Sequence, residues 1–280
     1  MLRTAAEVRT LGPADVPALR SLLARDPEVN VFVEHRVAVT KLDPRWLGGQ
    51  IWGYYEGHRL LAACHYAANV VPVNADDAAV EAFASLAASR QRTCGSLVGP
   101  SDQVMPLWER LERTWGPARS VRRNQPFLVM HEPSALPPDP LVRPVTLGEV
   151  DALYPASVAM YTEEVGVSPE QGSGSGYRGR VAQLVGRGWA FARIEDGEVV
   201  FKAEVGAATP YACQVQGVWV HPDRRGEGLA APAMAAVVEQ VLRTIAPVVT
   251  LYVNEHNTPA RAVYDRVGFQ RTATFTTVLF

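Results

Sequence analysis

The segment that decides the fold reads Val218-Trp219-Val220-His221-Pro222-Asp223-Arg224-Arg225-Gly226-Glu227-Gly228-Leu229-Ala230-Ala231. An apolar run typical of a strand stops at a proline, two arginines and two glycines follow, and an amphipathic helix then begins. The glycines permit a tight turn, while the first helical amides lack intrahelical acceptors and lie at the positive end of the helix dipole. The segment therefore predicts an anion site, which suits a pyrophosphate better than a single carboxylate.

The same residues also have a plainer interpretation. A glycine-rich turn between a strand and a helix is a weak signal when it stands alone. In the functional interpretation Arg224 and Arg225 add positive charge at the rim of the anion site. In the plainer one they are solvated side chains on an ordinary connection.

A second segment, Asn257-Thr258-Pro259-Ala260-Arg261-Ala262-Val263-Tyr264-Asp265-Arg266-Val267-Gly268-Phe269, follows an apolar run. A cap near Asn257 with a proline in the first turn predicts a helix start, and Gly268 suits the position just past the end. Asn257 and Tyr264 are about two helical turns apart, so an amide and a phenol lie on roughly the same side. The alternative is that Asn257 is only a cap and Tyr264 only a core aromatic.

Together the two segments resemble the GNAT superfamily, the GCN5-related N-acetyltransferases. The family's pyrophosphate motif, Q/R-x-x-G-x-G/A, fits Arg225-Gly226-Glu227-Gly228-Leu229-Ala230, and the pattern N-x-x-A-x-x-x-Y-x-x-x-G-F begins at Asn257. The resemblance covers about half of the chain. It implies an enzyme that uses acetyl-CoA as acyl donor and acetylates a primary amine by direct attack. The acceptor, a small molecule, a peptide N-terminus or a protein lysine, is left open.

The resemblance also implies roles for individual residues. The backbone of Val218, Trp219 and Val220 would pair with the pantetheine arm of CoA. Asn257 would contact that arm near its reactive end, and Tyr264 would be the general acid that protonates the departing thiolate. The implied pyrophosphate-binding residues are Arg225, Gly226, Glu227, Gly228, Leu229, Ala230 and Ala231.

The general base is the point at which this chain departs from many relatives. They carry a glutamate on the penultimate strand, where this chain has Tyr252. Glu204 is the candidate base on the strand before residues 213–220. Glu163, Glu164 and a water relay are the alternatives, and for each glutamate a structural or solvated carboxylate is the competing interpretation.

The length of 280 residues predicts two domains. Four prolines within a short polar stretch place a linker at residues 133–140. We expect a degenerate GNAT-like domain over residues 1–132 and the catalytic GNAT domain over residues 141–280. Each would be a mixed α/β domain with a twisted sheet flanked by helices. The N-terminal half has Gly99-Pro100-Ser101-Asp102 but no second arginine-glycine loop, so we expect that it does not bind CoA. This arrangement resembles tandem GNAT proteins and a high-GC bacterial group with an uncharacterised N-terminal domain.

Hydrophobic periodicity predicts the individual elements. The expected helices are residues 14–24, 76–90, 105–115, 147–158, 177–185, 229–245 and 259–267. The expected strands are residues 50–55, 59–66, 96–98, 127–130, 141–145, 189–194, 199–205, 213–220, 248–253 and 274–280. The run Gly172-Ser173-Gly174-Ser175-Gly176 suggests a mobile lid over the acceptor.

Composition bounds the remaining possibilities. The net charge of −2 gives no support to a nucleic-acid or membrane surface, and the histidines and three cysteines lack metal-ligand spacing. Without a signal peptide or membrane span, the expected location is the cytoplasm. Two other functions stay open. One is a non-catalytic acyl-CoA-binding regulatory module, and the other is a tRNA-dependent aminoacyl transferase of GNAT-like fold.

Overall fold

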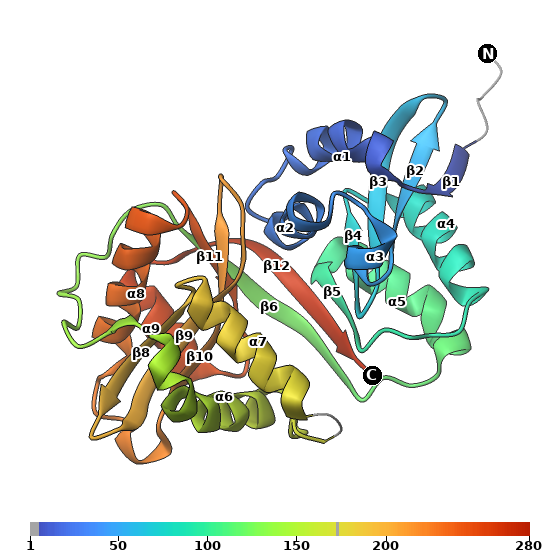
Figure 1. The fold of residues 1–280 in the computed structure, drawn as a ribbon. Helices are drawn as coiled ribbons and strands as arrows, with labels where there is room; N and C mark the ends of the chain where they lie inside the picture. Colours follow the sequence, from blue (N-terminus) through green and yellow to red (C-terminus); the bar gives the residue numbers. More distant parts are fainter. Residues whose placement is uncertain (1–5, 172–173) are drawn as a thin grey trace. The chain divides into compact units, whose positions relative to one another are not determined.

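The computed structural model of the chain describes residues 6–171 and 174–280, and Figure 1 traces its helices and strands. The chain forms two compact units. The first contains the residues up to Phe127, Tyr252–His256 and Arg271–Phe280, and the second contains Leu128–Leu251 and Asn257–Gln270. Both units are mixed α/β structures, as the sequence predicts. Within the described residues, no helix is long and apolar enough to cross a membrane.

The first unit places helices on both faces of its sheet. Its elements are β1 (Ala6–Thr10), η1 (Pro13–Asp15), α1 (Val16–Leu23), α2 (Val31–Thr40), α3 (Pro44–Leu47), β2 (Gln50–Glu56), β3 (Arg59–Tyr66), β4 (Asn69–Val73), α4 (Asp77–Ala88), β5 (Ser96–Pro100), α5 (Ser101–Trp115), most of β6 (Ser120–Met130) and β12 (Gln270–Leu279). Strands β1 to β4 pair antiparallel in chain order, whereas β4 pairs parallel with β5.

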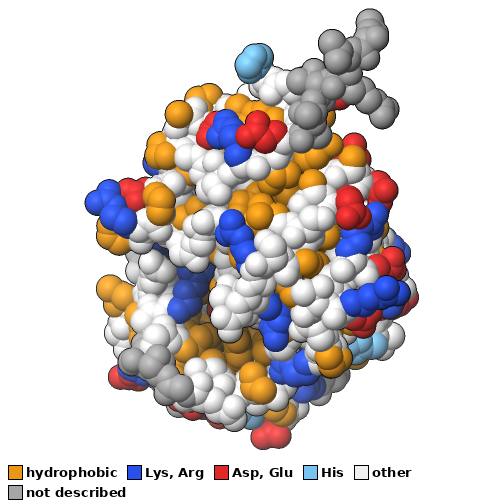
Figure 2. All heavy atoms as spheres, turned by 90° about the vertical axis from the view of Figure 1, so that its right-hand side faces the viewer, with side chains coloured by type: hydrophobic (Ala, Val, Ile, Leu, Met, Phe, Trp, Pro, Cys, Tyr) orange, Lys and Arg blue, Asp and Glu red, His pale blue; other side chains and the backbone are white. Residues whose placement is uncertain are grey.

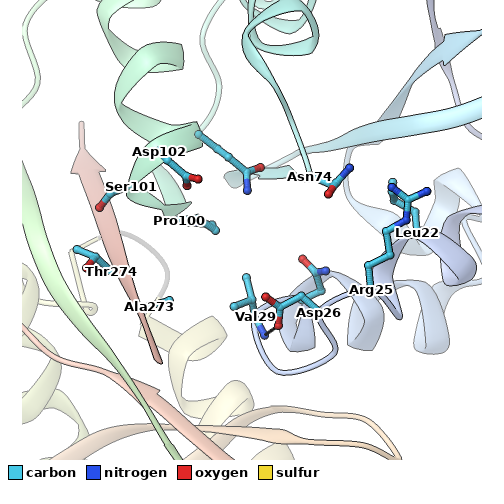
Figure 3. Close-up of a pocket in the computed structure, with 12 residues that line it drawn as sticks. Leu22, Arg25, Asp26, Val29, Asn74, Pro100, Ser101, Asp102, Ala273 and Thr274 are labelled. Atoms are coloured by element: carbon cyan, nitrogen blue, oxygen red, sulfur yellow. Dashed lines mark hydrogen bonds between the residues drawn. The ribbon is translucent and has the colours of Figure 1, made fainter. Parts of the chain in front are cut away.

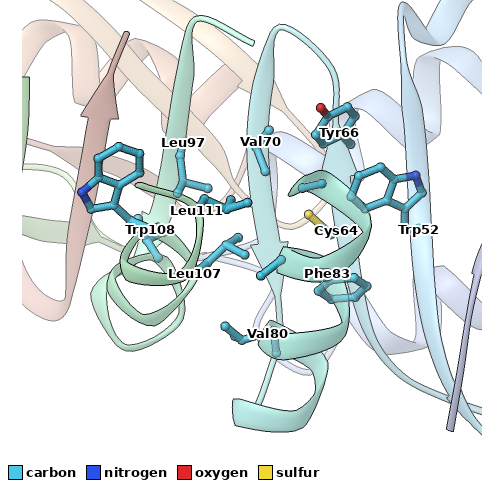
Figure 4. Packing of buried hydrophobic residues seen from close by; sticks show 14 of the residues in the cluster. Trp52, Cys64, Tyr66, Val70, Val80, Phe83, Leu97, Leu107, Trp108 and Leu111 are labelled. Carbon is cyan, nitrogen blue, oxygen red and sulfur yellow. The ribbon is translucent and has the colours of Figure 1, made fainter. Parts of the chain in front are cut away.

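Two hydrophobic clusters bury the two faces of this sheet. Helices α4 and α5 supply one cluster, in which Phe83 and Trp108 pack near Trp52 and Leu97 of the strands (Figure 4). Leu19 and Leu22 of α1 and Val37 of α2 supply the other cluster. Because both faces are covered, the strand residues between them are apolar on both sides.

The second unit repeats this plan. Its elements are β7 (Arg143–Pro144), η2 (Leu147–Glu149), α6 (Val150–Val165), α7 (Gly174–Gly186), β8 (Ala190–Glu195), β9 (Glu198–Ala208), β10 (Cys213–Val220), η3 (Pro222–Arg224), α8 (Ala230–Thr244), β11 (Val249–Tyr252) and α9 (Thr258–Val267). The sheet order within it is β11-β10-β9-β8-β7. Helices α6 and α7 pack on one side of these strands, and α8 lies beside α9.

The boundary between the two units does not lie at the proline-rich stretch, and each unit contains more than one segment of the chain. Residues 133–140 lie inside the second unit, where Asp139 accepts a hydrogen bond from Arg193 and Ser134 donates to the carbonyl of Val267. Strand β12 then pairs antiparallel with β5, with Val278 opposite Leu97. The last residues of the chain therefore complete the sheet of the first unit.

Candidate active site

A β-bulge distorts β10 in the middle of its pairing with β9. Gln216 lies opposite Glu204 and Trp219 opposite Lys202, so β10 contains one residue more than its partner between these two pairs. Gly217 occupies the bulge with φ +60°. A Cβ atom there would approach Met160 Cε to 3.0 Å and Lys202 Nζ to 3.1 Å, so the crowding and the positive φ both favour glycine.

A buried ion pair on β9 contacts the backbone of the bulge. The side chain of Lys202 is fully buried, and its Nζ donates to Glu204 Oε2 at 3.0 Å and to the Gly217 carbonyl at 3.1 Å. Gln216 Nε2 donates to the other carboxylate oxygen, Glu204 Oε1, at 3.1 Å. The structure thus places Glu204 beside the bulge, with both of its oxygens engaged.

Beyond the bulge, β10 separates from β11. The two strands pair in parallel only at Cys213 with Val249 and Gln214 with Thr250. The later part of β10, including Val218 and Val220, is therefore not paired to β11. This leaves the backbone edge at Val218 without a partner strand on the β11 side, while the Val220 carbonyl accepts from Arg225 Nε at 3.0 Å.

The loop after β10 provides a row of unused backbone donors. Gly226 and Gly228 have φ of +82° and +80°, and no atom lies within 4 Å of a Cβ built at either glycine. Within the described residues, the amides from Gly226 to Ala231 donate no backbone hydrogen bond. Helix α8 begins at Ala230, and its N-cap residue, Leu229, offers no side-chain cap. Free amides at a helix N-terminus favour an anion.

The two arginines of the loop contact carboxylates. Arg225 Nη2 pairs with Glu163 Oε2 at 2.8 Å, and Trp219 Nε1 donates to Glu163 Oε1 at 3.0 Å. Arg224 pairs with Glu195 at 2.6 Å and with Glu227 at 2.9 Å. Sequence reasoning placed both arginines at the rim of the anion site and did not find these partners. Glu163 connects α6 to β10 and to the loop.

Asn257 is the N-cap residue of α9, and Tyr264 lies within the same helix. Asn257 Oδ1 caps the helix by accepting from the Ala260 amide at 3.2 Å, which leaves its Nδ2 group for another partner. Tyr264 is 6% exposed and packs edge-on against Phe269. Burial raises the pKa of its hydroxyl, and the negative charge of Glu164 raises it further. The hydroxyl makes no hydrogen bond to the described residues.

A cavity of about 470 Å³ opens beside α6 and α7. Tyr161, Tyr177 and Arg180 line it, and the two tyrosine rings meet edge to face at 5.3 Å. Burial, followed by the charge of Glu204, raises the pKa of Tyr177. The glycine-serine run next to this cavity contains residues 172–173, which lie outside the described residues, so the predicted lid stays a prediction.

Known families match two parts of the chain. Residues 182–269 match the model of the Acetyltransferase (GNAT) family, a range that includes the bulge, the glycine loop, Asn257 and Tyr264. The chain contains a GNAT domain. Residues 49–153 match a domain of unknown function, DUF4081. No curated protein matches the sequence.

Solved structures extend the likeness to the GNAT fold over nearly the whole chain. A tandem GNAT protein from the clavulanic acid biosynthesis pathway is 18% identical, with 98% of both chains covered and a TM-score of 0.56. A GNAT-family acetyltransferase from Colwellia psychrerythraea is 13% identical, with 98% of this chain and 99% of that chain covered and a TM-score of 0.53. A Drosophila protein is 16% identical, with 99% of both covered and a TM-score of 0.64. At these identities the likeness concerns the fold.

The family and the fold together support acyl transfer as the general function of the GNAT domain. The loop and the two residues of α9 could be proposed from the sequence because their spacing is local, and their roles stay predictions. Sequence reasoning missed the role of Lys202. The one available signal was composition, because Lys41 and Lys202 are the only lysines in a chain that otherwise uses arginine. Within the described residues, no His, Cys, Asp and Glu side chains gather into a group that could hold a metal ion.

Proposed function

We propose that the GNAT domain transfers an acetyl group from acetyl-CoA to a primary amine. The observation that carries this proposal is the row of free amides from Gly226 to Ala231 at the start of α8. A pyrophosphate can accept several of these hydrogen bonds at once, and the helix dipole favours its charge. The open edge of β10 would then pair with the pantetheine arm.

The reaction that we propose is a direct attack. The amine nitrogen forms a bond to the thioester carbon, and a strand amide between Val218 and Val220 stabilises the oxyanion. The carbon–sulfur bond then breaks, and the leaving thiolate takes a proton from the hydroxyl of Tyr264. A phenol with its ordinary pKa near 10 is protonated at neutral pH, and burial raises the pKa of Tyr264 further, so the hydroxyl has a proton to give to the thiolate. The products are the N-acetylated amine and free CoA.

The attacking amine must lose a proton, and two carboxylates compete for the role of base. Glu204 accepts hydrogen bonds from Lys202 and Gln216, so both of its carboxylate oxygens already have partners. Glu164 is solvent-exposed, and its charge acts on Tyr264. Because acid and base must both be near the reacting carbon, we favour Glu164, directly or through water.

The acceptor is proposed to enter beside Tyr161 and Tyr177. An acidic acceptor region would favour a cationic amine, but Glu163 is paired with Arg225 and Glu170 accepts from Tyr154. Arg180 lines the cavity instead. This lining fits an amine that also carries apolar or acidic groups, and the acceptor itself stays open.

The two other functions have less support. A non-catalytic acyl-CoA-binding module would need no acid, whereas this chain has the phenol of Tyr264 about two helical turns after Asn257 on α9. A tRNA-dependent transferase would need a basic surface. The net charge of −2 gives no support to such a surface, and on the face drawn in Figure 2 the lysine and arginine side chains are spread among uncharged and acidic ones.

The proposal is tested by thermal unfolding with and without acetyl-CoA. Acetyl-CoA at 100 times its Kd should stabilise the wild-type protein by roughly 2.7 kcal/mol. Gly228→Glu should abolish this shift, because it strains a backbone of φ +80° and adds a negative charge to the anion site. Gly188→Glu is the matched control, since Gly188 also has positive φ and open space but lies between α7 and β8.

The control variant should keep the full shift. No shift of the wild type at millimolar acetyl-CoA would contradict the proposed donor. A shift that survives in Gly228→Glu would place the pyrophosphate elsewhere. With binding established, release of free CoA in the presence of an amine panel would then distinguish transfer from binding alone.

A further inference from the structure

The first unit also contains a cleft between two diverging parallel strands. Strands β4 and β5 pair only at Asn69 with Ser96 and Val70 with Leu97, just as β10 and β11 pair at two positions. A cavity of about 430 Å³ lies where β4 and β5 end (Figure 3). Ligands of open α/β sheets bind outside the carboxyl ends of strands at such a point of divergence. Polar residues that line it include Arg25, Asp26, Asn74, Ser101, Asp102 and Thr274.

This cleft has no place for a pyrophosphate. The connection from β4 to α4 contains no glycine, and Asp76 Oδ1 caps α4 by accepting from the Ala79 amide at 2.9 Å. Gln103 Oε1 accepts from the Ala75 amide, also at 2.9 Å. The chain's own side chains thus occupy amides that a diphosphate would need. The first unit therefore has a cleft at diverging strands without the free amides that a pyrophosphate would need.

The charges of the cavity come from opposite walls. Figure 3 shows Arg25 and Asp26 on the wall formed after α1, and Ser101 and Asp102 on the wall formed by the start of α5. Within the described residues, the guanidinium of Arg25 and the carboxylate of Asp102 make no hydrogen bond or ion pair. Both side chains are exposed to solvent at the mouth of the cavity, where a ligand that supplies the opposite charges can pair with them.

Two amide side chains that line the cavity are held in place by backbone carbonyls. Asn30 is 8% exposed, and its Nδ2 is held by the Leu23 carbonyl, so its amide lines the cavity in one orientation. Asn74 is held in the same way by the Leu61 carbonyl. Burial raises the pKa of Asp26, with the charge of Glu28 as a lesser cause, and a bound cation would relieve that cost.

We propose that this cavity is a binding site for a small zwitterion of the amino-acid type. The carboxylate of the ligand would pair with Arg25, and its ammonium group would pair with Asp102, with Asp26 nearby. The volume is within the usual range for small-molecule sites, about 300–1,000 Å³. This site is independent of the proposed acetyl transfer, and it lies within the first unit.

Calorimetric titration of the full chain with the standard amino acids tests this proposal. At least one amino acid should bind. Two analogues of that amino acid, one without the carboxylate and one without the amino group, should each bind at least roughly tenfold more weakly. The reason is that each lost charged pair costs about 1.4 kcal/mol or more. Arg25→Ala and Asp102→Asn should weaken binding by the same factor. Arg113→Ala and Glu112→Gln, two exposed changes at the far end of α5, are the matched controls.

The outcomes are distinct from those of the acetyl-CoA experiment. Amino-acid binding should persist in Gly228→Glu, which alters only the second unit. Binding of no amino acid at millimolar concentration, or equal binding of the singly charged analogues, would overturn the proposal. So would loss of acetyl-CoA binding in Arg25→Ala, since that would make this cavity part of a CoA site.

Discussion

At the scale of single residues, Tyr264 is the proposed acid, and burial changes how tightly it holds its proton. A phenol has an ordinary pKa near 10, and desolvation disfavours its charged form. In this chain burial and the charge of Glu164 both raise the pKa of Tyr264. The folded protein therefore holds the Tyr264 proton more tightly than the unfolded chain does. The phenol is protonated at neutral pH. Because its pKa is higher in the folded protein than in the unfolded chain, the free energy of unfolding should fall only as the pH rises above about 10.

Replacement of this one oxygen gives a direct prediction. Tyr264→Phe should lower kcat by about 10²-fold, the lower range for loss of a general acid, and should leave acetyl-CoA binding unchanged. Steady-state release of CoA measures kcat, and the thermal shift measures binding. In the wild type, no alkaline loss of kcat from this group is expected below about pH 10.

The control for this change is Tyr211→Phe, because Tyr211 is 61% exposed. It should have wild-type kcat. If Tyr264→Phe also had wild-type kcat, the thiolate would take its proton from elsewhere. If it lost acetyl-CoA binding, the phenol would contribute to the donor site and not to the chemistry.

At the scale of elements, the bulge in β10 contacts the buried ammonium group of Lys202, which lies on the neighbouring strand β9. Lys202 Nζ contacts Glu204 and the carbonyl of Gly217, so it fixes a backbone group that ordinary strand pairing would leave unmatched. Removal of one partner from a buried ion pair leaves the other charge uncompensated. Lysine suits this position because its compact ammonium can donate to several acceptors, whereas a guanidinium is larger and planar.

Two variants separate stability from positioning. Lys202→Met should destabilise the protein by about 3 kcal/mol, because Glu204 is then buried without its partner. The double variant with Lys202→Met and Glu204→Leu should regain most of that stability. If Lys202 positions the bulge, kcat should be below the wild-type value in both variants, because the Gly217 carbonyl has then lost its donor. Denaturant unfolding measures the first quantity, and CoA release measures the second. A stable double variant with wild-type kcat would show that the bulge does not need the ammonium.

The elements differ in how far the sequence could predict them. Strand β10 has the bounds that its apolar pattern predicts, residues 213–220. Helix α2 was missed, because its valines are spread around the helix and form no clear apolar stripe. Strand β4 was missed because Pro72 argues against a strand, although its neighbours pair with β3. The loop of the candidate site could be predicted from local spacing, whereas the Lys202–Glu204 pair depends on how two strands are registered.

At the scale of the whole molecule, each unit covers a sheet with helix pairs and contains one diverging parallel pair of strands. Strand β12 is the element that breaks this sequential order, because it follows the second unit in the chain and pairs with β5 of the first. Val278 of β12 is fully buried in the same cluster as Trp108. The core of the first unit is thus incomplete without it.

Val278→Ala should therefore weaken the first unit, although this residue lies near the C-terminal end of the sequence. The loss of two buried carbons predicts a destabilisation of about 2 kcal/mol. Hydrogen exchange should become faster in α4 and α5 and should not change in α8. Val39→Ala is the control, since Val39 is 53% exposed. Faster exchange confined to α8 and α9 would contradict the assignment of β12 to the first unit.

The placement of β12 also has a consequence for synthesis on the ribosome. The first unit emerges early, yet the strand that pairs with β5 is translated only after residues 128–270. Until then the edge of β5 and part of the core next to Trp108 have no partner. A nascent first unit would be a natural client for chaperones, since unpaired strand edges and exposed apolar surface promote aggregation. Slow translation of residues 128–270 would prolong that exposure, so the yield of this protein in cells should depend on the elongation rate over a region that belongs mostly to the second unit.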